Sequence, residues 1–121
     1  TGPSRRSQMP RGRRRVFKAM RYAARTDANH RAIVKTLRSE QASVTSLAAV
    51  GKGVPDLLVG IAGETHLVEV KDGAKVPSAQ MLTKDQRAFI KSWRGADVVI
   101  LRDVDIARTW VRRVREKYEN S

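Results

Sequence analysis

One stretch of the chain, residues 51–73, constrains the fold more strongly than any other. It reads GKGVPDLLVGIAGETHLVEVKDG. Two predominantly apolar runs, Leu57–Val59 and Leu67–Val70, lie on either side of a glycine-bearing turn within residues 60–65. Runs of leucine and β-branched residues bounded by Gly and Pro are typical of the two strands of a β-hairpin. The stretch therefore predicts a pair of antiparallel strands.

Three charged side chains occupy this otherwise apolar hairpin. Asp56 opens the first strand, and Glu69 and Lys71 lie two residues apart in the second. Since successive side chains of a strand point to opposite faces, Glu69 and Lys71 are expected on the same face. Antiparallel pairing would bring Asp56 close to Glu69. The sequence thus predicts two carboxylates and one ammonium group on a single patch of the sheet.

The spacing of apolar residues elsewhere predicts three helices and two more strands. The first helix is expected from residue 26 or 27 to residue 41, with Ile33, Val34 and Leu37 on its buried face. The other predicted elements are a strand at 43–50, a helix at 84–94 capped by Thr83, a strand at 97–101 and a helix capped by Asp103. The resulting order, α-β-β-β-α-β-α, is typical of an α/β fold in which helices pack on a central mixed sheet.

The apolar stripes of the two later helices carry large aromatic residues. Trp93 follows Phe89 and Ile90 in one stripe, and Trp110 and Tyr118 lie in the other. At this helical spacing, packing into the core is the expected role of the tryptophans, ahead of stacking on nucleic-acid bases.

Gln86 lies on the apolar side of the helix predicted at 84–94, between Leu82 and Phe89. An amide buried without a hydrogen-bond partner costs roughly 1–3 kcal/mol. Gln86 therefore requires a partner, either in a functional site or at a nearby backbone carbonyl, and it is a candidate site residue. His30, in the first turn of the first helix, is interpreted as a surface or capping histidine rather than a catalytic one.

The chain is strongly basic, with 25 Lys and Arg against 12 Asp and Glu and a net charge of +13. Nine basic residues and no acidic one fall within residues 1–25. We expect a basic flexible arm over 1–25, with an optional short helix at 16–25, followed by one folded domain over 26–121. This charge favours a polyanionic partner, most commonly nucleic acid, while a solvated tail stays an alternative for the arm. The candidate nucleic-acid contacts are Arg11, Arg13, Arg14, Arg15, Lys52 and Lys75.

The composition also excludes several classes of protein. The chain has no cysteine, which excludes disulfides and thiolate metal sites. No apolar run is long enough to span a membrane, and no signal-peptide core is visible. We therefore expect a cytoplasmic location and no membrane partner.

The paired carboxylates predict a metal site. Two neighbouring carboxylates repel each other unless a cation holds them, and burying either one unpaired would be costly or force its protonation. Mg²⁺, for which Mn²⁺ is expected to substitute, accepts one or two carboxylates and keeps exchangeable waters. Asp56 and Glu69 are the expected ligands, with the backbone carbonyl of Val70 as a third. Lys71 would orient or activate a metal-bound water and stabilise charge developing on a phosphorus atom.

Each of these motifs alone is common by chance. Asp56 after Pro55 can simply start a strand, and Glu69 and Lys71 can form a solvated ion pair. Their conjunction, followed by an inward-facing Gln86 on the next helix, favours a functional site over these structural interpretations.

The segments GVPDLLVG and LVEVKDG resemble the PD-(D/E)xK nuclease superfamily and, within it, the virus-type replication-repair nuclease (VRR-NUC) domain found in many phages. The resemblance covers roughly residues 27–111. It implies a restriction-endonuclease-like, three-layer α/β/α sandwich that hydrolyses phosphodiester bonds with a divalent metal. It also implies catalytic roles for Asp56, Glu69, Lys71 and Gln86.

The resemblance departs from the family pattern at one place. Related nucleases often carry an acidic residue near the start of the first helix, where this chain offers Asp27 or Asn29. Whether one metal or two would bind is therefore left open. Similarity to small junction resolvases implies a homodimer, and the phage members imply the cytoplasm of a host cell.

The expected function is a Mg²⁺-dependent DNA endonuclease selective for branched or otherwise structured DNA, in phage replication, repair or recombination. A chain this short has little room for a module that reads base sequence. Two alternatives stay open, a catalytically weak nucleic-acid-binding module on the same fold and an RNA-directed nuclease.

Overall fold

The computed structural model describes residues 28–74 and 81–120. The elements in chain order are a helix at 28–39, β1 (Ser43–Ser46), β2 (Leu57–Ile61), β3 (Glu64–Val70), α3 (Lys84–Ser92), β4 (Val99–Leu101) and α4 (Val104–Glu119). This confirms the predicted order α-β-β-β-α-β-α. The predicted arm at 1–25, Asp27 and Lys75 lie outside the described residues.

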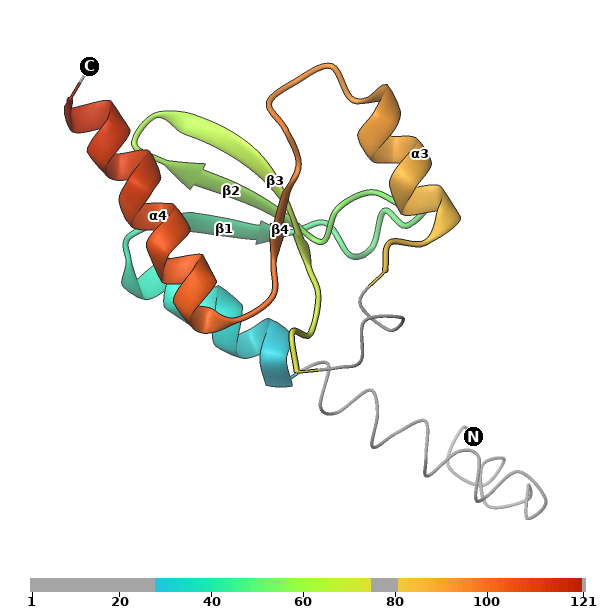
Figure 1. Ribbon diagram of the computed structural model, residues 1–121, viewed down its shortest axis with the longest axis horizontal. Coiled ribbons are helices and arrows are strands. Elements are labelled where there is room, and N and C mark those ends of the chain that lie inside the picture. The colour runs from blue at the N-terminus through green and yellow to red at the C-terminus, as the bar shows by residue number, and fades with distance from the viewer. Residues whose placement is uncertain (1–27, 75–80, 121) are drawn as a thin grey trace, which may run out of the picture.

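The four strands form one mixed sheet in the order β1-β2-β3-β4 (Figure 1). β1, β2 and β3 pair antiparallel, and β4 runs parallel to β3. The predicted hairpin is β2 and β3, joined by the two residues Ala62 and Gly63, which have φ angles of 50° and 84°. Two-residue turns with positive φ match the right-handed twist of paired strands, so this turn fixes the register in which Leu57 lies opposite Val68.

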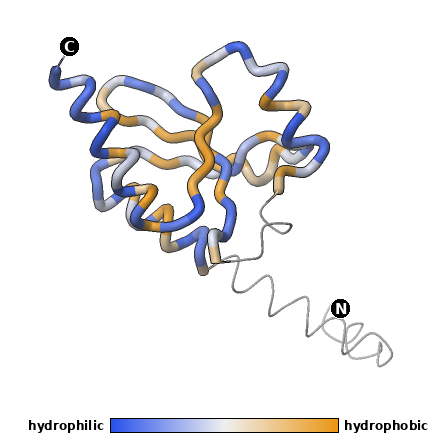
Figure 2. The backbone as a smooth tube through the Cα atoms, viewed as in Figure 1, coloured by the Kyte–Doolittle hydropathy of each residue, from blue (hydrophilic) through white to orange (hydrophobic). Residues whose placement is uncertain are grey.

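The hydrophobic core lies between one face of the sheet and two helices, the helix at 28–39 and α4 (Figure 1). Ile33 and Leu37 from the first helix and Val111 from α4 are fully buried. Alternate residues of β2, Leu57, Val59 and Ile61, supply the sheet side of this core. Figure 2 shows the hydrophobic residues gathered along these central strands.

The third helix, α3, lies toward the other face of the sheet. Val68 belongs to the core, so its neighbour Glu69 points away from that core, and Gln86 of α3 bonds to Glu69. The loop before β2 abuts the first turn of α3. A Cβ atom on Gly53, which has a φ of 80°, would collide with the backbone carbonyl of Asp85. Only glycine permits both this conformation and this close approach.

Several predicted boundaries and burials are wrong. β1 ends at Ser46 rather than residue 50, because the Ser46 hydroxyl accepts a hydrogen bond from the Ala48 amide and the chain then turns. No residue of α3 is buried, and β4 begins at Val99. Trp93 is 45% exposed and stacks on Phe89 with the ring centroids 5.3 Å apart.

Tyr118 is also exposed, whereas Trp110 packs against the core as expected. An apolar stripe shows which side of a helix is apolar, but it does not show whether another element covers that side. Among the described residues, no helix is long and apolar enough to cross a membrane.

Candidate active site

Asp56 lies at the open end of the hairpin, where a hydrogen bond from β3 holds it. It precedes β2, and its Oδ2 accepts a hydrogen bond from the backbone amide of Val70 at 2.8 Å. Pro55 before it is fully buried, which fixes the entry of the chain into the strand. The carboxylate of Asp56 is therefore tied to β3 within one residue of Glu69.

Glu69, Lys71 and Gln86 form a closed set of contacts. The Gln86 amide Nε2 donates to Glu69 Oε2 at 2.8 Å, and Lys71 Nζ donates to Gln86 Oε1 at 2.9 Å. Lys71 Nζ also lies 3.7 Å from the same Glu69 oxygen. The predicted placement of Glu69 and Lys71 on one side of the strand is thus confirmed.

The carboxyl group of Glu69 is buried, since only 5% of its side chain is exposed. Burial raises the pKa of Glu69 to about 7, and the charge of Asp56 and a hydrogen bond between the two carboxyl groups act in the same direction. The ammonium group of Lys71 acts against them. A proton or a cation shared by the two acids would therefore relieve their repulsion.

The capping box of α3 places Gln86 at the site. The Thr83 hydroxyl accepts from the Gln86 amide at 3.2 Å, while Gln86 Oε1 accepts from the Thr83 amide at 2.9 Å. This reciprocal pair turns the glutamine back over the helix start. The side-chain amide then reaches Glu69 rather than a nearby backbone carbonyl, the alternative that the sequence left open.

Asn29, in the first turn of the first helix, touches the same segment of chain. Its Nδ2 donates to the backbone carbonyl of Lys71 at 3.2 Å. Of the two residues considered for the missing acid, Asn29 thus holds the strand end that carries Lys71. Asp27, the other residue that could replace the missing acid, lies outside the described residues.

The donor atoms around the two acids fit a hard divalent cation. Asp56 and Glu69 supply carboxylates. The carbonyl of Val70 points to the same side of the strand as the Val70 amide, which already bonds to Asp56. Carboxylate and peptide oxygens are the ligands that Mg²⁺ takes in proteins. Within the part of the chain that the structure describes, no three His, Cys, Asp or Glu side chains are gathered as a metal-binding group.

The residues predicted to contact nucleic acid are mostly outside the described part of the chain. Lys52 is described, exposed in the loop beside Gly53. Arg11, Arg13, Arg14, Arg15 and Lys75 are not. Comparisons of this chain with protein families, curated proteins and solved structures found no match.

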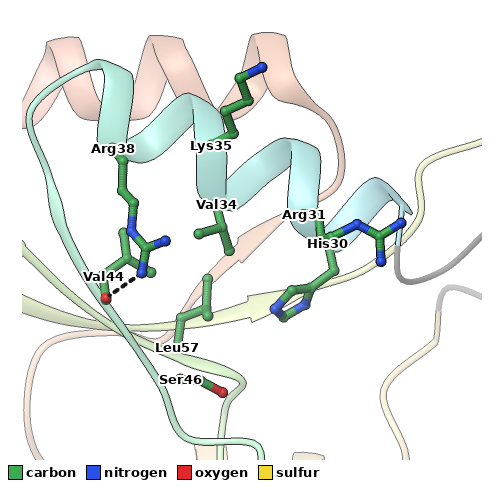
Figure 3. A pocket seen from close by; sticks show the side chains of 8 residues that line it. All are labelled: His30, Arg31, Val34, Lys35, Arg38, Val44, Ser46 and Leu57. Carbon is green, nitrogen blue, oxygen red and sulfur yellow. Dashed lines mark hydrogen bonds between the residues drawn. The ribbon is translucent and has the colours of Figure 1, made fainter.

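Sequence reasoning did not foresee a group of basic residues around a pocket on the other face of the sheet, beside the helix at 28–39 (Figure 3). His30, which was interpreted as a surface or capping residue, lines a pocket of about 540 Å³ together with Arg31, Lys35 and Arg38. The helical spacing of Arg31, Lys35 and Arg38 on one side of the helix was the available signal. It did not reveal which strand this side would face.

Proposed function

We propose that this protein is a Mg²⁺-dependent DNA endonuclease of the PD-(D/E)xK type, acting on branched or otherwise structured DNA. One observation carries the proposal. Asp56 and Glu69 lie together at the mouth of the hairpin, and Lys71 and Gln86 contact the same Glu69 oxygen. A buried acid whose pKa is raised by burial and by a second acid beside it is typical of functional sites.

The residues of the site have separate roles in the proposed reaction. Asp56, Glu69 and the Val70 carbonyl would hold Mg²⁺, and when bound the ion supplies electrophilic polarisation of the phosphate and a more acidic water. The ammonium group of Lys71 orients the attacking water and stabilises negative charge that develops on the phosphate oxygens. Lys71 is suited to this because its side chain is 14% exposed, so the charge is only partly screened.

Gln86 acts as a positioning residue. Its two ends bond to Glu69 and Lys71, so it fixes the distance between an acid and a cation that would otherwise pair directly. Groups that orient metal ligands in this way commonly affect metal affinity or activity by about 10–100-fold.

The direct test compares three variants of nearly identical size with the unchanged protein. Asp56→Asn and Glu69→Gln each remove one carboxylate from the site, and Asp105→Asn removes one from the surface of α4, where the side chain is 88% exposed. All three and the unchanged protein are incubated with a branched DNA, a linear duplex of the same composition and an RNA, with Mg²⁺ and with EDTA. Strand cleavage is followed on denaturing gels.

The proposal expects cleavage by the unchanged protein and by Asp105→Asn, only with Mg²⁺ and fastest on the branched DNA. Both site variants should lose at least about 100-fold in single-turnover rate, since each removes a metal ligand. Binding of DNA without cleavage by any protein would establish a binding module instead. Cleavage of RNA alone would reassign the substrate, and cleavage by both site variants would place the active site elsewhere.

A further inference from the structure

The side of α3 that is turned toward the sheet is largely uncovered. Gln86, Phe89 and Trp93 recur at helical spacing along this side, and Gln86 reaches Glu69 of β3. No residue of α3 is buried, however, and Trp93, directly after the helix, is 45% exposed. The side of α3 that contacts the candidate site therefore offers an accessible aromatic ring.

The ring of Trp93 is accessible but held in place. It stacks on Phe89 with the ring planes 17° apart and the centroids 5.3 Å apart. The backbone of Gly95 lies so close to the indole that a Cβ atom on Gly95 would be 2.6 Å from Trp93 Nε1. A partner that stacks on Trp93 would thus cost little conformational entropy in ordering this side chain.

A row of basic side chains follows the same helix. Lys84, Arg87 and Lys91 recur at spacings of three and four residues, which places them on one side of α3, and Arg94 follows the helix end. All of them are exposed, and Asp85 is the only acidic residue within residues 84–94. We call these four basic residues the basic row. The helix therefore combines a positively charged side with an accessible aromatic ring.

The helix connects this surface to the candidate site. Gln86 bonds to both Glu69 and Lys71. Trp93 follows Gln86 by seven residues, which is about 10 Å along a helix axis. Stacked nucleotides of one strand are about 3.4 Å apart. A DNA strand whose phosphate lies at Asp56 and Glu69 is therefore within roughly three nucleotides of the ring.

We propose that α3 is a DNA-contact helix. The ring of Trp93 stacks on a base whose face is exposed where the duplex is interrupted, and the basic row binds the phosphates of the adjoining strand. The inference rests on the proposed nuclease function. It deepens that function by naming an exposed base face as the feature that distinguishes branched from continuous DNA.

The combination of ring and charge favours DNA over an acidic protein. An acidic protein segment would match the basic row but has no use for a rigid, exposed indole. Nucleic acid supplies phosphates for the cations and flat bases for the aromatic ring. In a continuous duplex each base is stacked between its neighbours, and only its edges are accessible in the grooves. A branch or an unpaired stretch exposes a base face, which a tryptophan can bind without reading the sequence.

Binding without cleavage provides the first test. The unchanged protein in EDTA is titrated into two fluorescent single-stranded oligodeoxynucleotides of equal length, one complete and one with an abasic central stretch. Both carry the same phosphates, so basic residues contribute equally to each. The complete strand should bind about fivefold more tightly, as a base contact at the weaker end of the known range would give. Equal affinities would overturn the inference.

Variants then locate the base contact. Trp93→Ala should abolish the preference for the complete strand, and Trp93→Phe should retain most of it because a flat ring is kept. Tyr118→Ala is the matched control, since it removes a 59% exposed ring from α4, on the opposite side of the sheet (Figure 1). It should leave the preference unchanged. A preference that survives Trp93→Ala, or that Trp93→Phe loses as completely, would contradict stacking on Trp93.

The basic row is tested by the salt dependence of binding. The double variant Lys84→Gln, Lys91→Gln should weaken the binding of both strands alike. It should reduce the slope of log affinity against log salt concentration by about 1.4, the value for two phosphates of a single strand. The control, Arg113→Gln with Lys117→Gln, removes the same charge from exposed positions of α4 and should change the slope much less. Equal slopes in the two double variants would overturn the role of the row.

These results are separable from those of the nuclease test. If Trp93→Ala abolishes the base preference but no protein cuts DNA, the DNA-contact helix stands and the proposed catalysis falls. If Asp56→Asn abolishes cleavage but Trp93→Ala leaves both the base preference and the cleavage rate on branched DNA unchanged, the catalysis stands and the inference about α3 falls.

Discussion

The side-chain amide of Gln86 donates to Glu69 Oε2 at 2.8 Å and so joins α3 to the central strand β3. This bond makes the candidate site a composite of two parts of the fold. The acids and the lysine belong to a hairpin whose other face is packed into the core. The amide belongs to a helix of which no residue is buried.

Removing the amide should reduce activity more than stability. We expect Gln86→Ala to lower single-turnover cleavage by about 10–100-fold, because Glu69 and Lys71 lose the group that holds both. Thr83→Ala is the control, since it breaks the same capping box at a cost of about 1 kcal/mol without touching Glu69. If both variants lost the same activity, the role of Gln86 would be only to hold the helix.

The approach of Gly53 to α3 gives a second prediction. Gly53→Ala would drive a Cβ atom into the Asp85 backbone and displace the first turn of the helix, which carries Gln86. Gly51→Ala is a matched control because its φ is also positive, 71°, yet its Cβ would have no neighbour within 4 Å. Backbone strain should destabilise both by about 1 kcal/mol, and the collision with Asp85 should destabilise Gly53→Ala further. Only Gly53→Ala should lose activity, about tenfold or more.

The raised pKa of Glu69 predicts a pH-dependent effect of Mg²⁺ on stability. The folded, metal-free protein holds the Glu69 proton more tightly than the unfolded chain, so its stability falls as the pH rises from the ordinary pKa of 4.5 through about 7. Mg²⁺ favours the ionised carboxyl and should offset that loss.

Thermal unfolding measures this effect directly. Saturating Mg²⁺ should raise the Tm by roughly 3 °C or more at about pH 8 and by much less at about pH 5.5. Glu69→Gln should remove the difference between the two pH values. An equal increase in Tm at both values would mean that Mg²⁺ binds at another place.

Glu40 connects the end of the first helix to α4. Its carboxylate accepts from Arg112 at 3.0 Å, and this hydrogen bond lowers the pKa of Glu40, with the charges of Arg112, Arg108 and Arg115 adding to it. The stabilisation is present above the ordinary pKa of 4.5 and is lost as the pH falls through the lowered value.

Arg112→Gln should therefore lower the Tm at neutral pH and low salt, with a smaller change at high salt or in acid. Arg113→Gln removes the same charge from an exposed position one residue away and should leave the Tm nearly unchanged. Equal effects of the two substitutions would show that the net charge, and not the pair with Glu40, matters.

The affinity for DNA should depend steeply on salt. If the protein engages about six phosphates, the logarithm of the binding constant should fall with the logarithm of the salt concentration with a slope near −5. Deleting residues 1–15 should reduce that slope and leave metal-dependent cleavage at saturating protein intact. A collapse of cleavage as well would mean that the arm belongs to the active site.

The hairpin and the placement of its charges were predictable because they depend on local rules. Alternation along β3 fixes Glu69 and Lys71 on one face, and the Gly63 turn fixes the register with β2. The buried positions Ile33 and Leu37 follow from helical spacing in the same way. In each case the deciding interactions lie within one element or between neighbours in the chain.

The remaining features depend on contacts that no local pattern contains. The bond from Asn29 to Lys71 joins residues 42 positions apart, and the pocket beside it exists only because the first helix lies across β1 and β2. The exposure of Trp93 was equally unpredictable from its spacing, since no residue of the preceding helix α3 is buried. Sequence spacing gives the faces of the elements but not their lateral positions.

The weak attachment of α3 also affects how easily this helix would separate from the sheet. A helix with no buried residue, docked by a cap, a glycine contact and one amide, can detach at a small free-energy cost while the sheet stays folded. Amide hydrogen exchange should then separate the site into two classes, with slow exchange around Glu69 and fast exchange around Gln86. The hairpin would keep the two acids in place at all times, and docking of α3 would set the fraction of molecules in which Lys71 is correctly held.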